Sequence, residues 1–153
     1  MHQGVFVGTV EDCRPRGDAW AVVHACKSPC HQHALGYSKS LPATHPNYLV
    51  FERGADLFLN IIDPPLPLFK APLFVEALRF SQAHAAAGRQ LLFHCNQGQS
   101  RAPSLALLHL AKNLRLLDAT SYEAAAREFV QVYPSYTPGR GIQLYLEEHW
   151  EEF

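Results

Sequence analysis

The sequence predicts an α/β fold, with a central, mostly parallel sheet of four to five strands flanked by helices. Short apolar runs typical of strands occur at 5–7, 20–23, 48–51, 56–62 and 91–93. Segments with helical spacing of apolar residues lie between and after the later strands. A chain of 153 residues can bury one core, so we expect a single domain over 1–153.

Clusters of turn-forming residues separate the strands that precede residue 63. "RPRGD" follows the first strand, and "SLPATHPN" leads to the strand at 48–51. "DPPLP" ends the strand at 56–62, because proline has no N–H group to donate to a sheet. The run 91–93 is continuously apolar, which indicates a central strand that is buried on both faces.

Four helices are expected in the second half of the chain. Apolar residues recur every three or four positions from Phe69, which predicts a helix over 69–87. The segment 101–117 is apolar on most sides and predicts a buried helix. "TSYE" has the spacing of a capping box and opens a helix that ends near 132. A last amphipathic helix is expected over 142–150.

Composition and charge argue against several classes of protein. The formal net charge is −1, so we expect no basic surface for nucleic acid. The first residues lack the basic and apolar regions of a signal peptide, and no window is apolar for long enough to span a membrane. We therefore expect a cytoplasmic protein with reduced cysteines and with neither nucleic-acid nor membrane partners.

The stretch "LLFHCNQGQSRAPS" places a thiol and a guanidinium at a strand-to-helix junction. Cys95 follows the buried strand, and the loop 96–100 leads into the helix that Arg101 begins. Backbone N–H groups of such a loop can surround an anion, the helix dipole adds positive potential, and Arg101 can hold two phosphate oxygens. This potential also favours the thiolate of Cys95, while Gly98 leaves room for the ligand. The loop could therefore bind a tetrahedral anion and activate a nucleophile beneath it.

The segment "HCNQGQSR" resembles the signature loop of the cysteine-dependent protein tyrosine phosphatases, and its glycine and last serine resemble the dual-specificity branch. "VFVGTVED", "AWAVVHAC" and "YPSYTPGRGIQLYLEEHW" extend the resemblance over most of the chain. It implies a protein tyrosine phosphatase-like fold in which Cys95 attacks phosphorus, Arg101 holds the phosphoryl oxygens, and His94 tunes the thiolate. No cofactor and no metal are expected. The substrate-binding residues implied are Asn96, Gln97, Gly98, Gln99, Ser100 and Arg101.

The same resemblance implies a general acid about thirty residues before the cysteine. Asp63 lies 32 residues before Cys95, directly after the strand at 56–62, and the prolines that follow it would stiffen its loop. Asp56 is the rival, but it begins that strand and would lie at the opposite end of the sheet. We therefore expect Asp63 to protonate the leaving oxygen.

One position departs from the common pattern of the resembled family. The residue after the arginine is commonly Ser or Thr, whose hydroxyl assists expulsion of the thiolate, whereas this chain has Ala102. The departure predicts slower hydrolysis of the phosphoenzyme, unless Ser100 or Ser104 compensates.

The segment "HACKSPCHQH" allows two special interpretations beside ordinary packing. A zinc site could use Cys26, Cys30 and one or two of the histidines, but no second ligand pair follows at a usual distance. Alternatively, Cys26 resembles a cysteine that forms a disulfide with the nucleophile in a lipid phosphatase of the same superfamily. A nearby thiol can trap an oxidised nucleophile reversibly.

The function that these features predict is hydrolysis of phosphotyrosine, with phosphoserine and phosphothreonine as further substrates. The expected partner is a phosphorylated protein or peptide. The uncharged Asn96, Gln97 and Gln99 disfavour a phosphoinositide substrate, and the neutral charge disfavours RNA 5′-phosphates. A phosphoglucan substrate and sulfur or arsenate chemistry are further alternatives. A pseudophosphatase that binds phosphoproteins without turnover is the alternative from another class.

Overall fold

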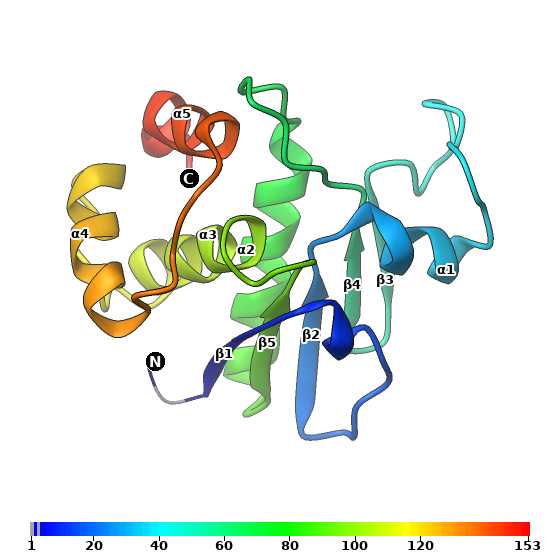
Figure 1. The fold of residues 1–153 in the computed structure, drawn as a ribbon. Helices are drawn as coiled ribbons and strands as arrows, with labels where there is room; N and C mark the ends of the chain where they lie inside the picture. Colours follow the sequence, from blue (N-terminus) through cyan, green and yellow to red (C-terminus); the bar gives the residue numbers. More distant parts are fainter. Residues whose placement is uncertain (1, 3) are drawn as a thin grey trace.

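A computed structural model describes residue 2 and residues 4–153. Its centre is a five-stranded sheet in the order β1-β5-β2-β4-β3 (Figure 1). β1, β5, β2 and β4 are parallel, and β3 is the antiparallel edge. The prediction of an α/β fold with a mostly parallel sheet is therefore confirmed. The strands are β1 (Val5–Gly8), β2 (Trp20–His24), β3 (Val50–Arg53), β4 (Asp56–Leu59) and β5 (Gln90–His94).

Short helical segments precede the third strand, and longer helices follow the fourth. The early segments are η1 (Val10–Asp12), η2 (Lys27–His31) and α1 (Gln32–Leu35). The later ones are α2 (Ala71–Ala86), α3 (Arg101–Leu108), η3 (His109–Asn113), α4 (Tyr122–Val132), α5 (Arg140–His149) and η4 (Trp150–Glu152). Within the described residues, no helix combines the length and the apolar character that crossing a membrane requires.

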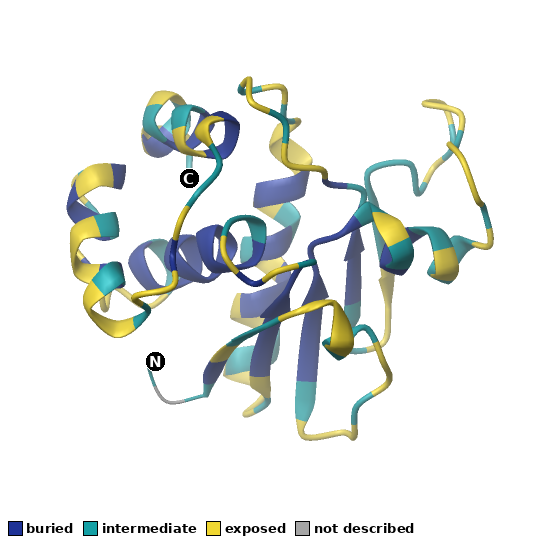
Figure 2. Ribbon diagram, in the orientation of Figure 1, coloured by how far each residue is buried: buried dark blue, intermediate teal, exposed yellow. Residues whose placement is uncertain are grey.

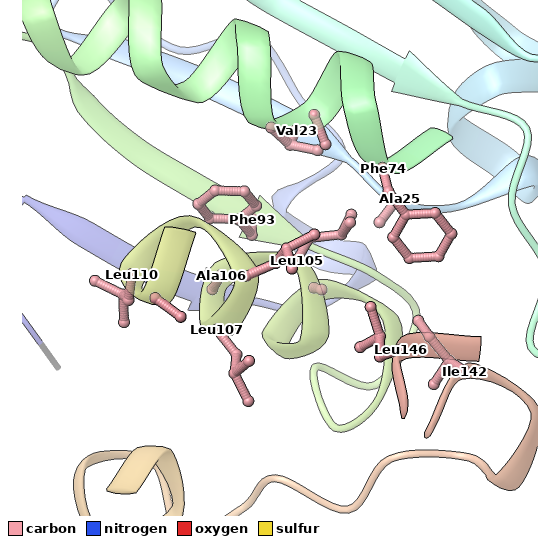
Figure 3. Packing of buried hydrophobic residues seen from close by; sticks show 14 of the residues in the cluster. Val23, Ala25, Phe74, Phe93, Leu105, Ala106, Leu107, Leu110, Ile142 and Leu146 are labelled. Carbon is pink, nitrogen blue, oxygen red and sulfur yellow. The ribbon is translucent and has the colours of Figure 1, made fainter. Parts of the chain in front are cut away.

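The central strands are buried on both faces, as their dark-blue colour in Figure 2 shows. Because side chains alternate along a strand, the two faces meet different partners. Phe93 of β5 and Val23 of β2 belong to the main hydrophobic core, where they lie near Leu105 and Ala106 of α3 (Figure 3). The intervening residues, such as His94, face the opposite side. The side of the sheet on which a residue lies therefore decides whether it joins the helical core.

Several expected boundaries differ from the structure, and β3, α2 and α5 each begin two residues from the expected position. The helix expected over 101–117 ends at Asn113, after a change to wider turns in η3. The strand expected over 56–62 ends at Leu59. The capping box at "TSYE" is wrong by one residue.

The cap of α4 is Ser121 rather than Thr120. The Ala124 N–H group donates to Ser121 Oγ at 3.1 Å. The Thr120 hydroxyl instead donates to Asp118 Oδ1 at 2.6 Å. Either hydroxyl could have capped this helix on local grounds, and the turn formed by Asp118 decides between them.

Candidate active site

The loop after β5 lies at the C-terminal edge of the parallel sheet, and backbone hydrogen bonds hold both of its flanks. Ala25 N–H, after β2, donates to His94 O at 2.8 Å. Val10 N–H, after β1, donates to Asn96 O at 3.2 Å. The neighbouring strands thus position the segment around Cys95 before any side chain contributes. This edge is where open α/β sheets bind ligands.

Gly98 allows the sharp turn in the middle of this loop. Its φ is +69°, and an added Cβ would lie 2.9 Å from the carbonyl oxygen of Gly8. The Tyr133 hydroxyl donates to Gly98 O at 2.7 Å. A larger residue would therefore be strained by its backbone and would also press against β1. The structural role of Tyr133 left no signal in the sequence.

Arg101 begins α3, and its guanidinium forms hydrogen bonds with two segments beside the pocket. Its Nη1 donates to Ile61 O at 3.1 Å, and its Nη2 donates to Asn96 Oδ1 at 2.7 Å. Its Nε is buried, and no hydrogen-bond partner for it exists among the described residues. No carboxylate in that part of the chain forms an ion pair with this guanidinium. The site therefore offers an anion one fixed positive charge and the N-terminus of a helix.

Cys95, Arg101 and Asp63 line one pocket of about 330 Å³. Cys95 is buried, with 2% of its surface exposed, whereas Asp63 is exposed. Most of the loop residues expected to bind substrate line the same pocket, but Gly98 and the supporting residues His94, Ala102 and Ser104 do not. The other residues that line the pocket are Asn96, Gln97, Gln99, Ser100, Thr137 and Gly139.

Two glycines of the last loop and helix allow the Asp63 loop to approach. A Cβ on Gly139 would lie 2.5 Å from Asp63 Oδ1, and one on Gly141 would lie 2.1 Å from Pro64 O. The Gly139 N–H group also donates to Ser100 Oγ at 2.8 Å. The start of α5 thus contacts both the loop 96–100 and the loop that carries Asp63. Sequence reasoning missed both glycines, because their neighbours lie far away in the chain.

The rival carboxylate, Asp56, has a different environment. Its Oδ1 lies 2.8 Å from His24 Nε2, and Asp56 does not line the pocket of Cys95. Asp56 begins β4, but its register places it level with Val22 and Leu92, and it reaches His24 at the end of β2. The expectation that Asp56 lies at the opposite end of the sheet is therefore wrong. Of the two candidates, only Asp63 reaches the pocket.

The two serine hydroxyls that could compensate for Ala102 differ in whether they reach the pocket. Ala102 is fully buried. Ser104 is also buried, and its Oγ lies 2.9 Å from the Tyr136 hydroxyl, which in turn lies 2.9 Å from the Tyr122 hydroxyl. Ser100 lines the pocket. The geometry therefore favours Ser100 over Ser104 as the hydroxyl available to Cys95.

His94 lies beneath the loop, on the other side of β5 from Cys95. Burial and, to a smaller extent, the neighbouring His24 lower the pKa of His94, while Asp12 and the Cys95 backbone raise it, and the net pKa is about 4. His94 Nε2 lies 2.6 Å from His24 Nδ1. The imidazole of His94 is therefore neutral at physiological pH.

The four cysteines divide into two kinds. The sulfur atoms of Cys13 and Cys30 are joined as a disulfide, so the expectation of reduced cysteines is wrong for these two residues. Cys26 and Cys95 are free and buried. Burial raises the pKa of Cys26 to about 11, with a smaller upward contribution from Cys95 and a downward one from Arg101. Cys26 is thus a protonated thiol, and its proposed redox role toward Cys95 stays a prediction.

The solved structures that resemble this chain are phosphatases or proteins with their fold. Human DUSP28 matches with a TM-score of 0.65 at 16% identity, over 99% of this chain and 94% of that one. A human tyrosine phosphatase-like serine/threonine/tyrosine-interacting protein matches at 0.60 and 16%, over 88% and 78%. PTPMT1, solved in complex with PI(5)P, matches at 0.60 and 15%, over 86% and 76%.

Comparisons by sequence give no further assignment. No protein-family model matches the chain, and no curated protein matches it. The chain has the fold shared by dual-specificity and protein tyrosine phosphatases, as the resemblance of its signature loop implied.

Proposed function

We propose that this chain is a single phosphatase domain that hydrolyses phosphotyrosine in proteins or peptides, with phosphoserine and phosphothreonine as further substrates. The observation that carries the proposal is the single pocket lined by Cys95, Arg101 and Asp63. A buried guanidinium nitrogen without a partner among the described residues supports it, because a bound phosphoryl oxygen would supply that partner.

The proposed reaction has two steps. Cys95 Sγ attacks phosphorus, the bond to the leaving oxygen breaks, and Asp63 gives its proton to that oxygen. Water then attacks the phosphocysteine and passes a proton to the Asp63 carboxylate, and the Cys95 thiolate is released. Arg101 and the loop N–H groups stabilise the charge on the equatorial oxygens in both steps.

The lining of the pocket favours a singly phosphorylated substrate. Arg101 is the only cation that lines it among the described residues, and Asn96, Gln97 and Gln99 are neutral. Highly charged substrates, such as multiply phosphorylated inositol rings or RNA 5′-triphosphates, would leave several phosphates without a cation. A phosphotyrosine side chain carries one dianion, which matches one guanidinium and one helix N-terminus.

The test is hydrolysis of para-nitrophenyl phosphate and of a tyrosine-phosphorylated peptide, beside phosphoinositides and phosphoglucans. We expect turnover of the first two, and a loss of more than about a thousandfold in Cys95→Ser. Cys26→Ser is the matched control, because it removes the other free thiol and leaves the nucleophile in place. Equal turnover by Cys95→Ser and the native chain would contradict the mechanism, and faster hydrolysis of a phosphoinositide would contradict the substrate.

A second candidate is a module that binds phosphoproteins without releasing phosphate. The observation that favours it is Ala102, which has no hydroxyl to assist expulsion of the thiolate. One of the similar structures is named as tyrosine phosphatase-like and as an interacting protein. This candidate predicts binding of a phosphotyrosine peptide by the native chain with less than one turnover per hour.

A further inference from the structure

Two cysteines and two histidines form a cluster behind the phosphate-binding loop, outside the pocket of Cys95. Cys13, His24, Cys30 and His94 each contribute a sulfur or a ring nitrogen, and these four atoms all lie within 4.8 Å of one another. All but Cys13 are buried, and Cys13 is partly buried. We propose that the reduced protein binds one Zn²⁺ ion through these four side chains.

The four atoms already lie near one another, but the bonded sulfurs and the two ring nitrogens would have to separate to form a tetrahedral site. Zn–N and Zn–S bonds of about 2.0–2.3 Å place neighbouring ligand atoms roughly 3.3–3.8 Å apart. His94 Nε2 lies 3.9 Å from Cys30 Sγ and 2.6 Å from His24 Nδ1. Side-chain movements of about 1 Å would therefore admit the ion. Two thiolates balance its charge, so the bound cluster is neutral, and zinc prefers this ligand set.

A carboxylate orients one of the histidines toward the cluster. Asp56 Oδ1 lies 2.8 Å from His24 Nε2, and a carboxylate can only accept, so this nitrogen carries the proton. Nδ1, the atom that faces His94, is then the ring nitrogen left to donate a lone pair to a metal. The ring plane is also fixed, because it stacks on Phe58 with centroids 4.3 Å apart. In zinc sites, a ligating histidine usually donates a hydrogen bond from its other ring nitrogen to a carboxylate, which fixes the orientation of the ring.

An ion can reach the cluster from outside. A pocket of about 180 Å³ is lined by Cys13, His24, Cys30 and Asp56. It is separate from the pocket of Cys95, with which it shares no lining residue. The exposed His33 also lines it and provides a matched control for His24.

The disulfide between Cys13 and Cys30 is the competing state of the same two sulfurs. A cellular thiol such as glutathione reduces it by supplying two electrons and two protons, and is itself oxidised to a disulfide. Zinc then replaces the two thiol protons, which pass to solvent. The two states are exclusive, so metal content reports which one the protein adopts.

The proposed ion would join segments that support the phosphate-binding loop. Cys30 lies on η2, whose Ser28 O accepts from Asn96 Nδ2 at 3.1 Å. Cys13 follows η1, whose Val10 N–H donates to Asn96 O. His94 directly precedes the nucleophile. These ligands are therefore positioning residues for the loop, and the ion itself does not contact the substrate.

The experiment measures metal in untagged protein that is expressed with zinc and purified in a phosphine reductant. We expect one zinc per chain and, after exchange for Co²⁺, visible d–d bands with thiolate charge transfer. Chelation should lower the unfolding midpoint by about 5 °C or more. None of these measurements requires phosphatase activity, so failure of the proposed function would leave them unchanged.

The zinc content of substituted proteins tests which side chains bind the ion. Cys13→Ser and His24→Asn should each lose at least nine-tenths of the zinc, while Cys26→Ser and His33→Asn should keep it. If a ligand variant fails to fold, the cobalt spectrum of the native chain still decides. Absence of zinc and of a thiolate–cobalt band in the reduced protein would overturn the proposal. Loss of zinc from Cys26→Ser but not from Cys13→Ser would overturn the ligand assignment.

Discussion

The phosphate-binding loop and the cysteine–histidine cluster lie on opposite sides of one strand end and are built in opposite ways. The loop is formed by seven consecutive residues, from Cys95 to Arg101. The cluster takes one residue each from the ends of η1, β2, η2 and β5, and they are separated by up to 81 positions. His94 and Cys95 are neighbours in the chain, yet one belongs to each site.

This difference shows how a strand end can serve two sites at once. Alternation along β5 sends consecutive side chains to opposite faces, so a nucleophile and a ligand can share one backbone segment. The site made of consecutive residues depends on backbone conformation, whereas the dispersed one depends on the packing of the sheet. The two sites should therefore respond differently to substitution.

The largest effect is expected at Asp63, the proposed acid. Asp63→Asn removes the proton donor while keeping the shape of the side chain, so kcat for a phosphotyrosine peptide should fall by about 10²- to 10⁴-fold, with little change in KM. Steady-state kinetics over a range of leaving groups checks it. The loss should shrink for para-nitrophenolate, which leaves without help. Zinc content should stay unchanged, and an equal loss for every leaving group would argue against an acid.

The next largest effect is expected on the zinc affinity of the cysteine–histidine cluster. Asp56→Ala removes the acceptor for His24 Nε2, so zinc affinity should fall by about 10- to 100-fold, as competition with a chelator would measure. Glu52→Ala on the neighbouring strand is the control, because that carboxylate is exposed and pairs with Arg79. An equal loss in the two variants would mean that general charge, rather than orientation of His24, sets the affinity.

Substitutions at two glycines can distinguish the effect of an unfavourable backbone conformation from the effect of steric crowding. Gly98→Ala and Gly88→Ala both place a side chain at positive φ, +69° and +81°, but only the first meets another atom closely. Each should lower the free energy of unfolding by about 1–2 kcal/mol. Only Gly98→Ala should also lower kcat/KM, by roughly tenfold, because β1 displaces the loop. Calorimetry and kinetics measure the two effects, and equal activities would refute the role of the close contact.

The smallest effect is expected at Ala102. If the missing hydroxyl slows hydrolysis of the phosphoenzyme, the native chain should show a burst of product, and Ala102→Ser should reduce the burst and raise steady turnover by roughly threefold. Rapid-quench kinetics measures both. Ala106→Ser adds the same hydroxyl at another buried position of α3 and should leave the burst unchanged. A burst that grows in Ala102→Ser would contradict the prediction.

Much of the fold and of the candidate site was predictable, because the relevant information is local. The apolar runs predicted all five strands, and the spacing of Asp63 from Cys95 predicted two residues that line one pocket. Where helices begin and end was less predictable. Ser121 rather than Thr120 caps α4, since the Thr120 hydroxyl is already used by Asp118.

The contacts between distant segments could not be predicted. Gly139 and Gly141 are unremarkable in sequence, and their importance follows from the loop of Asp63 that packs on them. The zinc interpretation of "HACKSPCHQH" named Cys26 and Cys30, but the structure brings Cys30 together with Cys13 and His94 and leaves Cys26 outside. Spacing rules fail for such a cluster because its members come from the ends of four different elements, η1, β2, η2 and β5.

The sequence by itself determined the α/β class and the loop from Cys95 to Arg101, because each depends on residues close together in the chain. The spacing of Asp63 from this loop also predicted that Asp63 lines the same pocket as Cys95. Only the tertiary structure decided that Asp56 serves His24, that Ser104 bonds to Tyr136, and that Cys13, His24, Cys30 and His94 meet behind the nucleophile. The physical reason is the parallel sheet, which aligns the ends of strands that are far apart in sequence and gives each strand end two faces.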